Sequence, residues 1–126
     1  MIVKTKDPMK GWSDPVKLNF EGIDPDIFFD DNGKAYVTHN DAPEKPLYEG
    51  HRVIKVWEYD LEKDQIIPGT DKVVVNGGVD LSKKPIWIEA PHLYKKDAKY
   101  YLMCAEGGTG GWHSEVIFIS DNPQGP

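Results

Sequence analysis

The sequence contains an internal repeat, and this feature constrains the fold more than any other. Residues 23–37, IDPDIFFDDNGKAYV, align without a gap with residues 88–102, IEAPHLYKKDAKYYL, at an offset of 65. The match resumes where residues 51–60 align with residues 114–123. Each copy has about three strand-like stretches, and no segment shows helical periodicity with capping residues. Repeated sheets without helices between them predict an all-β propeller, in which each unit is a small twisted sheet.

Each copy is predicted to begin with a β-hairpin. In the first copy, Asn32 and Gly33 are typical of a two-residue turn with positive φ at both central positions. The second copy has Asp97 and Ala98 at this place, which suit that turn less well, so we expect a different or looser turn there. After the first hairpin, residues 51–61 are apolar on both faces, which predicts a strand inside the sheet.

Both copies place a carboxylate at the start of the first strand, Asp24 in one and Glu89 in the other. The innermost strands of a propeller line its axis, so equivalent positions in neighbouring units converge on one funnel. Glycoside hydrolysis needs paired carboxylates, one of which donates a proton to the leaving oxygen. The alternative is that Asp24 caps a turn before Pro25 and that Glu89 is a solvated strand end. Spacing alone does not distinguish the two.

Four further residues are candidate substrate contacts. Glu106 ends the second strand of the later hairpin, and the glycines after it allow the backbone to approach a ligand closely. This Gly-rich loop contains Thr109 but lacks the lysine of a phosphate-binding loop. His113 follows the loop, and Ile23 precedes the first carboxylate. The candidates are therefore Ile23, Glu106, Thr109 and His113.

Composition argues against several classes of protein. The net charge of −6 disfavours a nucleic-acid or anionic membrane surface. No stretch is long and apolar enough to span a bilayer, and the first residues lack the apolar core of a signal peptide. Cys104 is the only cysteine, so it cannot form an internal disulfide, and we expect it to be a buried, inert strand residue. The compartment is undetermined.

No metal site is expected in this sequence. The four histidines lack metal-ligand spacing, which favours surface or hydrogen-bonded roles for them. The acidic run before Gly33 does not fit a calcium-binding loop, because His39 stands at the position that requires glutamate.

Three stretches, GIDPDIFFDDNGKAYV, IWIEAPHLYKK and YYLMCAEGGTG, resemble the motifs of the family 43 glycoside hydrolases. These enzymes are five-bladed β-propellers and include β-xylosidases, α-L-arabinofuranosidases and arabinanases. The resemblance covers nearly the whole chain and implies about two four-stranded antiparallel blades. Residues 1–18 would be the end of blade one and a crossing, residues 19–80 blade two, and residues 81–126 most of blade three.

The resemblance also implies an activity and the residues that perform it. The expected reaction is inverting hydrolysis of O-glycosidic bonds in plant cell-wall pentose polysaccharides, with xylo- or arabino-oligosaccharides as substrates. Glu89 would be the general acid, and Asp24 would keep this acid protonated and oriented. The aspartate that serves as base lies in an early motif that this chain does not contain, since Asp7 and Asp14 fall in the crossing. Many members hold a calcium ion in the channel, and later blades, which this chain does not contain, would hold it.

A two-blade piece has physical consequences of its own. It would expose apolar faces and open sheet edges, so we expect self-association. Inverting hydrolysis also needs a second carboxylate, so the isolated chain should have little or no activity. The alternative functions are a carbohydrate-binding module without chemistry and an interaction or structural propeller.

Overall fold

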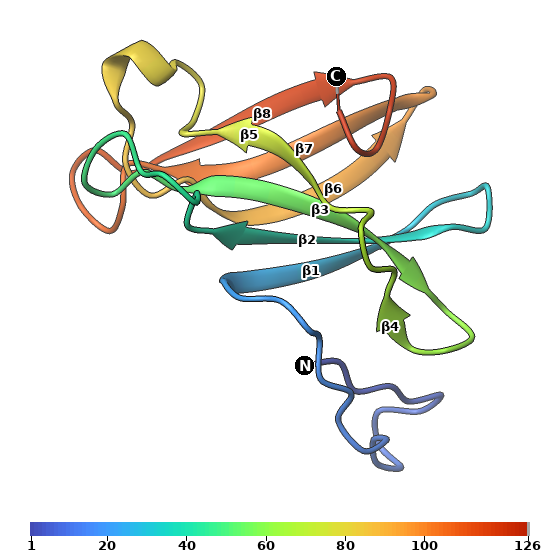
Figure 1. Ribbon diagram of the computed structural model, residues 1–126. Helices are drawn as coiled ribbons and strands as arrows, with labels where there is room; N and C mark the ends of the chain where they lie inside the picture. The colour runs from blue at the N-terminus through green and yellow to red at the C-terminus, as the bar shows by residue number, and fades with distance from the viewer. Residues whose placement is uncertain (126) are drawn as a thin grey trace.

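The structure is a computed structural model that describes residues 1–125, and most of its regular structure is β-strand (Figure 1). The elements, in chain order, are β1 (Ile23–Phe29), β2 (Ala35–Asp41), β3 (Val53–Asp60), β4 (Gln65–Ile66), β5 (Lys72–Asn76), the short 3-10 helix η1 (Leu81–Lys83), β6 (Glu89–Lys96), β7 (Lys99–Glu106) and β8 (Ser114–Ser120). Within residues 1–125, no helix has the length and apolar character needed to cross a membrane.

The strands form two antiparallel sheets. In the first sheet β1, β2 and β3 lie in order, and both β4 and β5 pair with β3. The second sheet has the order β6-β7-β8, and β6 packs against β1 and β2. Figure 1 shows the two sheets stacked, with the strands of one sheet roughly aligned along the same axis as those of the other. The all-β prediction is confirmed, and the described strands divide five to three between the sheets.

The turn of the first hairpin differs from the prediction. The backbone N–H of Asp30 donates to the Lys34 carbonyl, and the N–H of Gly33 donates to the Asp30 carbonyl, so the connection is longer than two residues. Within this turn, residues 30–34, only Gly33 has a positive φ, at 85°. The Asn32 side chain accepts a hydrogen bond from the Lys34 N–H at 2.8 Å, which stabilises this longer loop. The predicted two-residue turn was therefore wrong.

The second hairpin has the two-residue turn that the sequence predicted for the first. Lys96 pairs directly with Lys99. The two residues between them, Asp97 and Ala98, have φ values of 50° and 61°. Both central residues thus lie in the left-handed region, as a tight hairpin requires. The expectation of a different or looser turn in this hairpin was therefore wrong.

The inner strands β1 and β6 each change register close to their beginning. The shift in β1 lies between Ile23 and Asp26 and includes Asp24, which has a φ of 53°. The shift in β6 follows directly after Glu89, at Ala90, which has a φ of 49°. Bulges of this kind redirect side chains and are common beside active sites. The two predicted catalytic carboxylates therefore lie at equivalent irregularities.

Apolar side chains form two clusters. One fills the space between the sheets and contains Ile54, Val75, Ile88, Leu93, Tyr100, Leu102 and Cys104. The other packs the N-terminal segment against the first sheet and contains Leu18, Ala35, Val37, Tyr59 and Ile66. Cys104 lies fully buried in β7, as predicted, and burial raises the pKa of its thiol to about 12.

Candidate active site

Asp24 and Glu89 lie at the same end of the two sheets. Both β1 and β6 begin there, and the loops that follow β2, β5 and β7 gather at this end, on the left in Figure 1. A carboxylate oxygen of Asp24, Oδ2, accepts a hydrogen bond from the backbone N–H of Ala90 at 3.1 Å. The structure thus connects the first carboxylate to the residue next to the second.

Side chains of the first sheet hold the backbone around Glu89 at two further points. The Thr38 hydroxyl donates to the carbonyl of Pro91 at 3.1 Å, and the Asn40 amide donates to the carbonyl of Ile88. Both donors come from β2, and both are buried. The Glu89 side chain is half-buried, and its carboxylate accepts no hydrogen bond from residues 1–125. Its backbone is therefore fixed while its acid group is free for a ligand.

Glu106 is tied to the loop before β6. Its Oε2 accepts a hydrogen bond from the backbone N–H of Val79 at 2.9 Å. The loop approaches so closely that a Cβ at Gly78 would lie 2.1 Å from the same oxygen and 2.7 Å from Pro85 Cγ, and the φ of 140° at Gly78 also favours glycine. The carboxylate is half-buried at the end of β7. A substrate contact by Glu106 stays a prediction.

The Gly-rich loop between β7 and β8 exposes two of the other candidates. Thr109 and His113 are both solvent-exposed. His113 Nδ1 donates to the carbonyl oxygen of Gly108 at 2.9 Å, because a carbonyl oxygen can only accept. Ile23, at the start of β1, is 46% exposed. The structure places all three at or near the Glu89 end.

Trp87 is a candidate that sequence reasoning missed. It lies two residues before Glu89, has a φ of 54°, and leaves 40% of its surface exposed. Its backbone N–H donates to the Gly50 carbonyl at 2.9 Å, and the Arg52 guanidinium lies 4.9 Å from the ring centre. A bulky residue in the left-handed region is uncommon and is typical of ligand-binding sites. The sequence did offer a signal for this residue, because Trp87 stands two residues before Glu89 in the motif IWIEAPH.

His39 is a structural histidine. The Trp57 indole N–H donates to its Nε2 at 2.9 Å, and its Nδ1 donates to the Asn40 backbone carbonyl at 3.1 Å. Its ring stacks on Phe20 with centroids 3.9 Å apart. Burial lowers its pKa, so the ring is neutral at physiological pH. This hydrogen-bonded role agrees with the sequence prediction.

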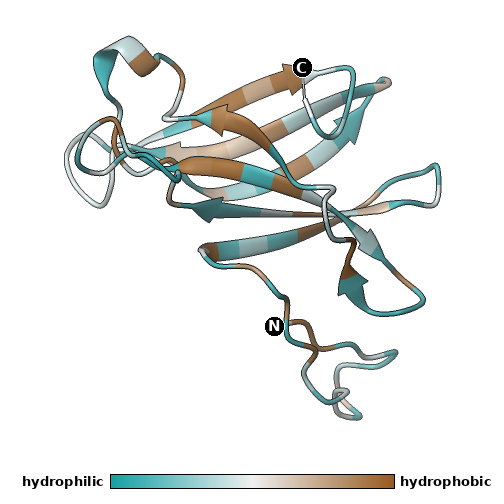
Figure 2. Cartoon of the chain, in the orientation of Figure 1, coloured by the Kyte–Doolittle hydropathy of each residue, from teal (hydrophilic) through white to brown (hydrophobic). Residues whose placement is uncertain are grey.

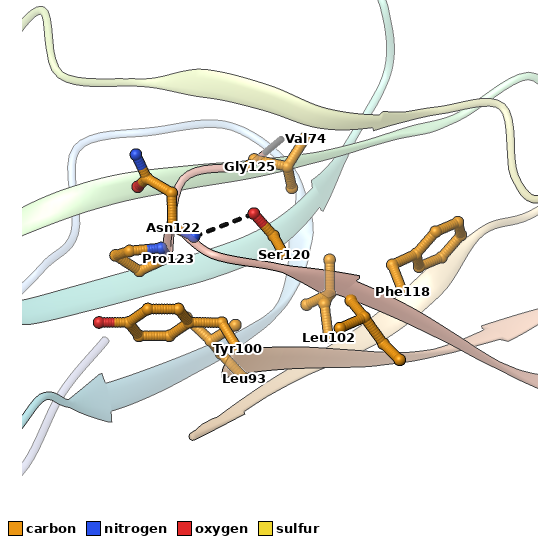
Figure 3. A pocket seen from close by; sticks show the side chains of 10 residues that line it. Val74, Leu93, Tyr100, Leu102, Phe118, Ser120, Asn122, Pro123 and Gly125 are labelled. Atoms are coloured by element: carbon orange, nitrogen blue, oxygen red, sulfur yellow. Dashed lines mark hydrogen bonds between the residues drawn. The ribbon is translucent and has the colours of Figure 1, made fainter. Parts of the chain in front are cut away.

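Two other features bear on ligand binding. Within residues 1–125, no group of three or more His, Cys, Asp or Glu side chains is arranged to hold a metal ion. An apolar cavity of about 190 Å³ lies between β5 and the second sheet, lined by residues that include Leu93, Tyr100 and Phe118 (Figure 3). None of the predicted site residues lines this cavity. The candidate site is the open, acidic end of the strands instead.

Two stacked antiparallel sheets, with acidic residues at the bulges that begin their inner strands, define part of a β-propeller with an acidic site at one end. A family model described as glycosyl hydrolases family 43 matches residues 1–126. The chain belongs to this family.

Curated relatives and solved structures agree with this assignment. A xylosidase/arabinosidase of Butyrivibrio fibrisolvens is 44% identical over 90% of this chain, which spans 22% of that relative. A non-reducing end alpha-L-arabinofuranosidase of Bacteroides ovatus is 38% identical over 98% of the chain and 21% of its own length.

Among solved structures, a family 43 protein retrieved from the capybara gut metagenome is 76% identical, with a TM-score of 0.96 over 98% of this chain and 23% of that one. The xylan beta-1,4-xylosidase of Bacillus halodurans is 35% identical, with a TM-score of 0.75 over 91% and 21%. The chain therefore spans about a fifth of the length of these relatives.

Proposed function

We propose that this chain is part of an inverting glycoside hydrolase that acts on saccharides containing xylose or arabinose, with Glu89 as the general acid. The observation that carries the proposal is the geometry around Glu89, a half-buried carboxylate with a fixed backbone and no partner among residues 1–125. The relatives named above are xylosidases and arabinosidases, which supports this substrate class.

The reaction needs two carboxylates with different tasks. Glu89 donates its proton to the glycosidic oxygen as the bond from the anomeric carbon to that oxygen breaks. A water molecule attacks the opposite face of the sugar, and its proton passes to a base about 6.5–9.5 Å from the acid. We propose that this base lies outside the present sequence, as the family resemblance implies. Asp24 orients the acid through its hydrogen bond to the Ala90 N–H.

The remaining candidates are proposed to contact the substrate. Trp87 offers an exposed aromatic face two residues before the acid, and ligand sites are commonly lined by aromatic groups with a few polar ones. Thr109 and His113 offer polar groups from the Gly-rich loop. Ile23 offers an exposed apolar side chain beside Asp24, and Glu106 a half-buried carboxylate.

The test uses a full-length chimera, in which residues 1–126 replace the matching segment of the 76% identical capybara-gut protein. Glu89→Gln should lower kcat on an aryl β-xyloside or aryl α-L-arabinofuranoside by about 1,000-fold, because the amide cannot donate the proton. Proton NMR of the first product should show the inverted anomer. Unchanged turnover by the Glu89→Gln variant contradicts the assignment of the acid, and carbohydrate binding without turnover by the parent chimera supports a binding module instead.

The same experiment includes the isolated chain, which we propose is inactive and associates with itself. Tyr94, Ile117 and Ile119 are exposed apolar side chains of the second sheet, and such surfaces favour association. Light scattering should show a mass above that of one chain. A monodisperse monomer, or turnover by the isolated chain, contradicts this part of the proposal.

A further inference from the structure

Two polar side chains, Thr38 and Asn40, are buried in the contact between the sheets, next to the backbone that flanks Glu89. Thr38 and Asn40 are both 0% exposed, and their spacing places them on one face of β2. Figure 2 colours this end of β2 as hydrophilic although the strand is buried there. Contacts between sheets are ordinarily apolar, so a polar pair at this position requires a physical reason.

The two side chains bind β6 where its own ladder is interrupted. The register of β6 shifts after Glu89, so the neighbouring strand β7 does not hold this stretch evenly. Thr38 donates to the Pro91 carbonyl at 3.1 Å, and Asn40 donates to the Ile88 carbonyl. One bond is therefore placed before Glu89 and the other after it.

Stability alone does not explain this arrangement. The amide oxygen of Asn40, Oδ1, is buried and has no hydrogen-bond partner among residues 1–125. An unpaired buried acceptor costs free energy, whereas an apolar pair of similar volume would pack the sheets without that cost. What the polar pair adds is a fixed position for the bulge, since both hydrogen bonds are directional.

We propose that Thr38 and Asn40 are positioning residues that aim the carboxyl group of Glu89 at the glycosidic oxygen. The inference rests on the proposed function, in which Glu89 is the general acid. A proton donor must be held within a fraction of an ångström of its productive place, and small displacements lower the rate steeply. The two residues touch neither substrate nor the reacting atoms, and they act through the backbone of β6.

The experiment measures kinetics of Asn40→Leu and Thr38→Val in the full-length chimera. Each variant keeps the side-chain volume close and removes the donor, so kcat should fall about 100-fold for Asn40→Leu and less for Thr38→Val, with KM within about 2-fold. Thr38→Ser keeps the hydroxyl, so its kcat should be close to that of the unmodified chimera and above that of Thr38→Val. An unchanged kcat in Asn40→Leu and Thr38→Val overturns the proposal.

Gln124 provides a matched control. It is also a buried amide, and its Nε2 donates to the carbonyls of Val56 at 3.2 Å and Thr70 at 2.7 Å, which links the C-terminal segment to the first sheet. These carbonyls are not in β6. Gln124→Leu should lower the melting temperature yet keep kcat. If its kcat falls as far as that of Asn40→Leu, any lost contact between the segments lowers activity and the specific role is refuted.

The leaving group separates positioning of the acid from general damage. A dinitrophenyl glycoside loses its leaving group without protonation, so Asn40→Leu should lose much less activity on it than on a substrate with a poor leaving group. An equal loss on both substrates overturns the inference. Adding Asn40→Leu to Glu89→Gln should cause no further loss on the poor leaving group. Full activity of Glu89→Gln alone would instead refute the proposed function, and this inference with it.

Discussion

The two ends of the contact between the sheets use polar groups in opposite ways. At the Glu89 end, the neutral donors Thr38 and Asn40 bind backbone carbonyls, and the acid itself stays unpaired among the described residues. At the other end of the strands, Asp30 is a carboxylate with a fully buried side chain and three tight partners. The charged group is thus paired at the end where it stabilises the fold, and the carboxylate is unpaired at the end where chemistry is proposed.

Asp30 illustrates how a buried charge is stabilised. Lys95 lies 2.7 Å from its carboxylate, and the Tyr100 hydroxyl donates to it at 2.7 Å. Burial alone would raise the pKa of Asp30, but the hydrogen bonds from Lys95, Tyr100 and the Asp31 N–H outweigh it and lower the pKa to about 2. The carboxylate is therefore ionised at neutral pH and links the first hairpin to the second.

At the Asp30 end, the largest expected effect of a mutation is on stability. Asp30→Asn in the full-length chimera should lower the free energy of unfolding by about 3 kcal/mol, because the buried ion pair loses one partner. The kcat should stay within about 2-fold, since the change lies at the far end of β1 from the acid. Chemical denaturation and steady-state kinetics measure the two quantities. A large loss of kcat without loss of stability would contradict the structural role given to Asp30.

The pH dependence of stability should follow the same group. The pKa of Asp30 is about 2 in the folded protein and 3.8 without these contacts, so its contribution is present above pH of about 4 and is lost as pH falls through about 2. This shift corresponds to about 2 kcal/mol, at about 1.4 kcal/mol for each pH unit. The melting-temperature difference between the chimera and its Asp30→Asn variant should shrink from about pH 5 to pH 2. A constant difference would show that the ion pair is not its source.

The smallest effect concerns the two hairpin turns at the Asp30 end. Ala98 has a φ of 61°, so Ala98→Gly should stabilise the chimera by about 0.5–1 kcal/mol. Gly33, with a φ of 85° and open space around its Cα, is the matched control, and Gly33→Ala should destabilise by a similar amount. Thermal denaturation measures both, and changes of the same sign would contradict the turn assignment.

The repeat in the sequence predicted the strand pairs and the shared end of Asp24 and Glu89. Alternation of apolar and polar residues indicates the strands, and the offset of 65 between the copies shows that Asp24 and Glu89 are equivalent positions. It did not predict the turn types, since the Asn32 side chain favours a longer loop through its own hydrogen bond. The roles of Thr38 and Asn40 could not be predicted either. Their partners lie about fifty residues later in the chain, and only the packing of two sheets brings them together.

The bonds from β2 to β6 also bear on how the protein is made. The ribosome releases the first sheet before β6, and domains tend to fold in that order. Thr38 and Asn40 can therefore stand in place as a template when the Glu89 bulge emerges, and the bulge docks onto donors that already exist. A nascent chain whose first sheet has misfolded does not present these two donors to the backbone on either side of Glu89.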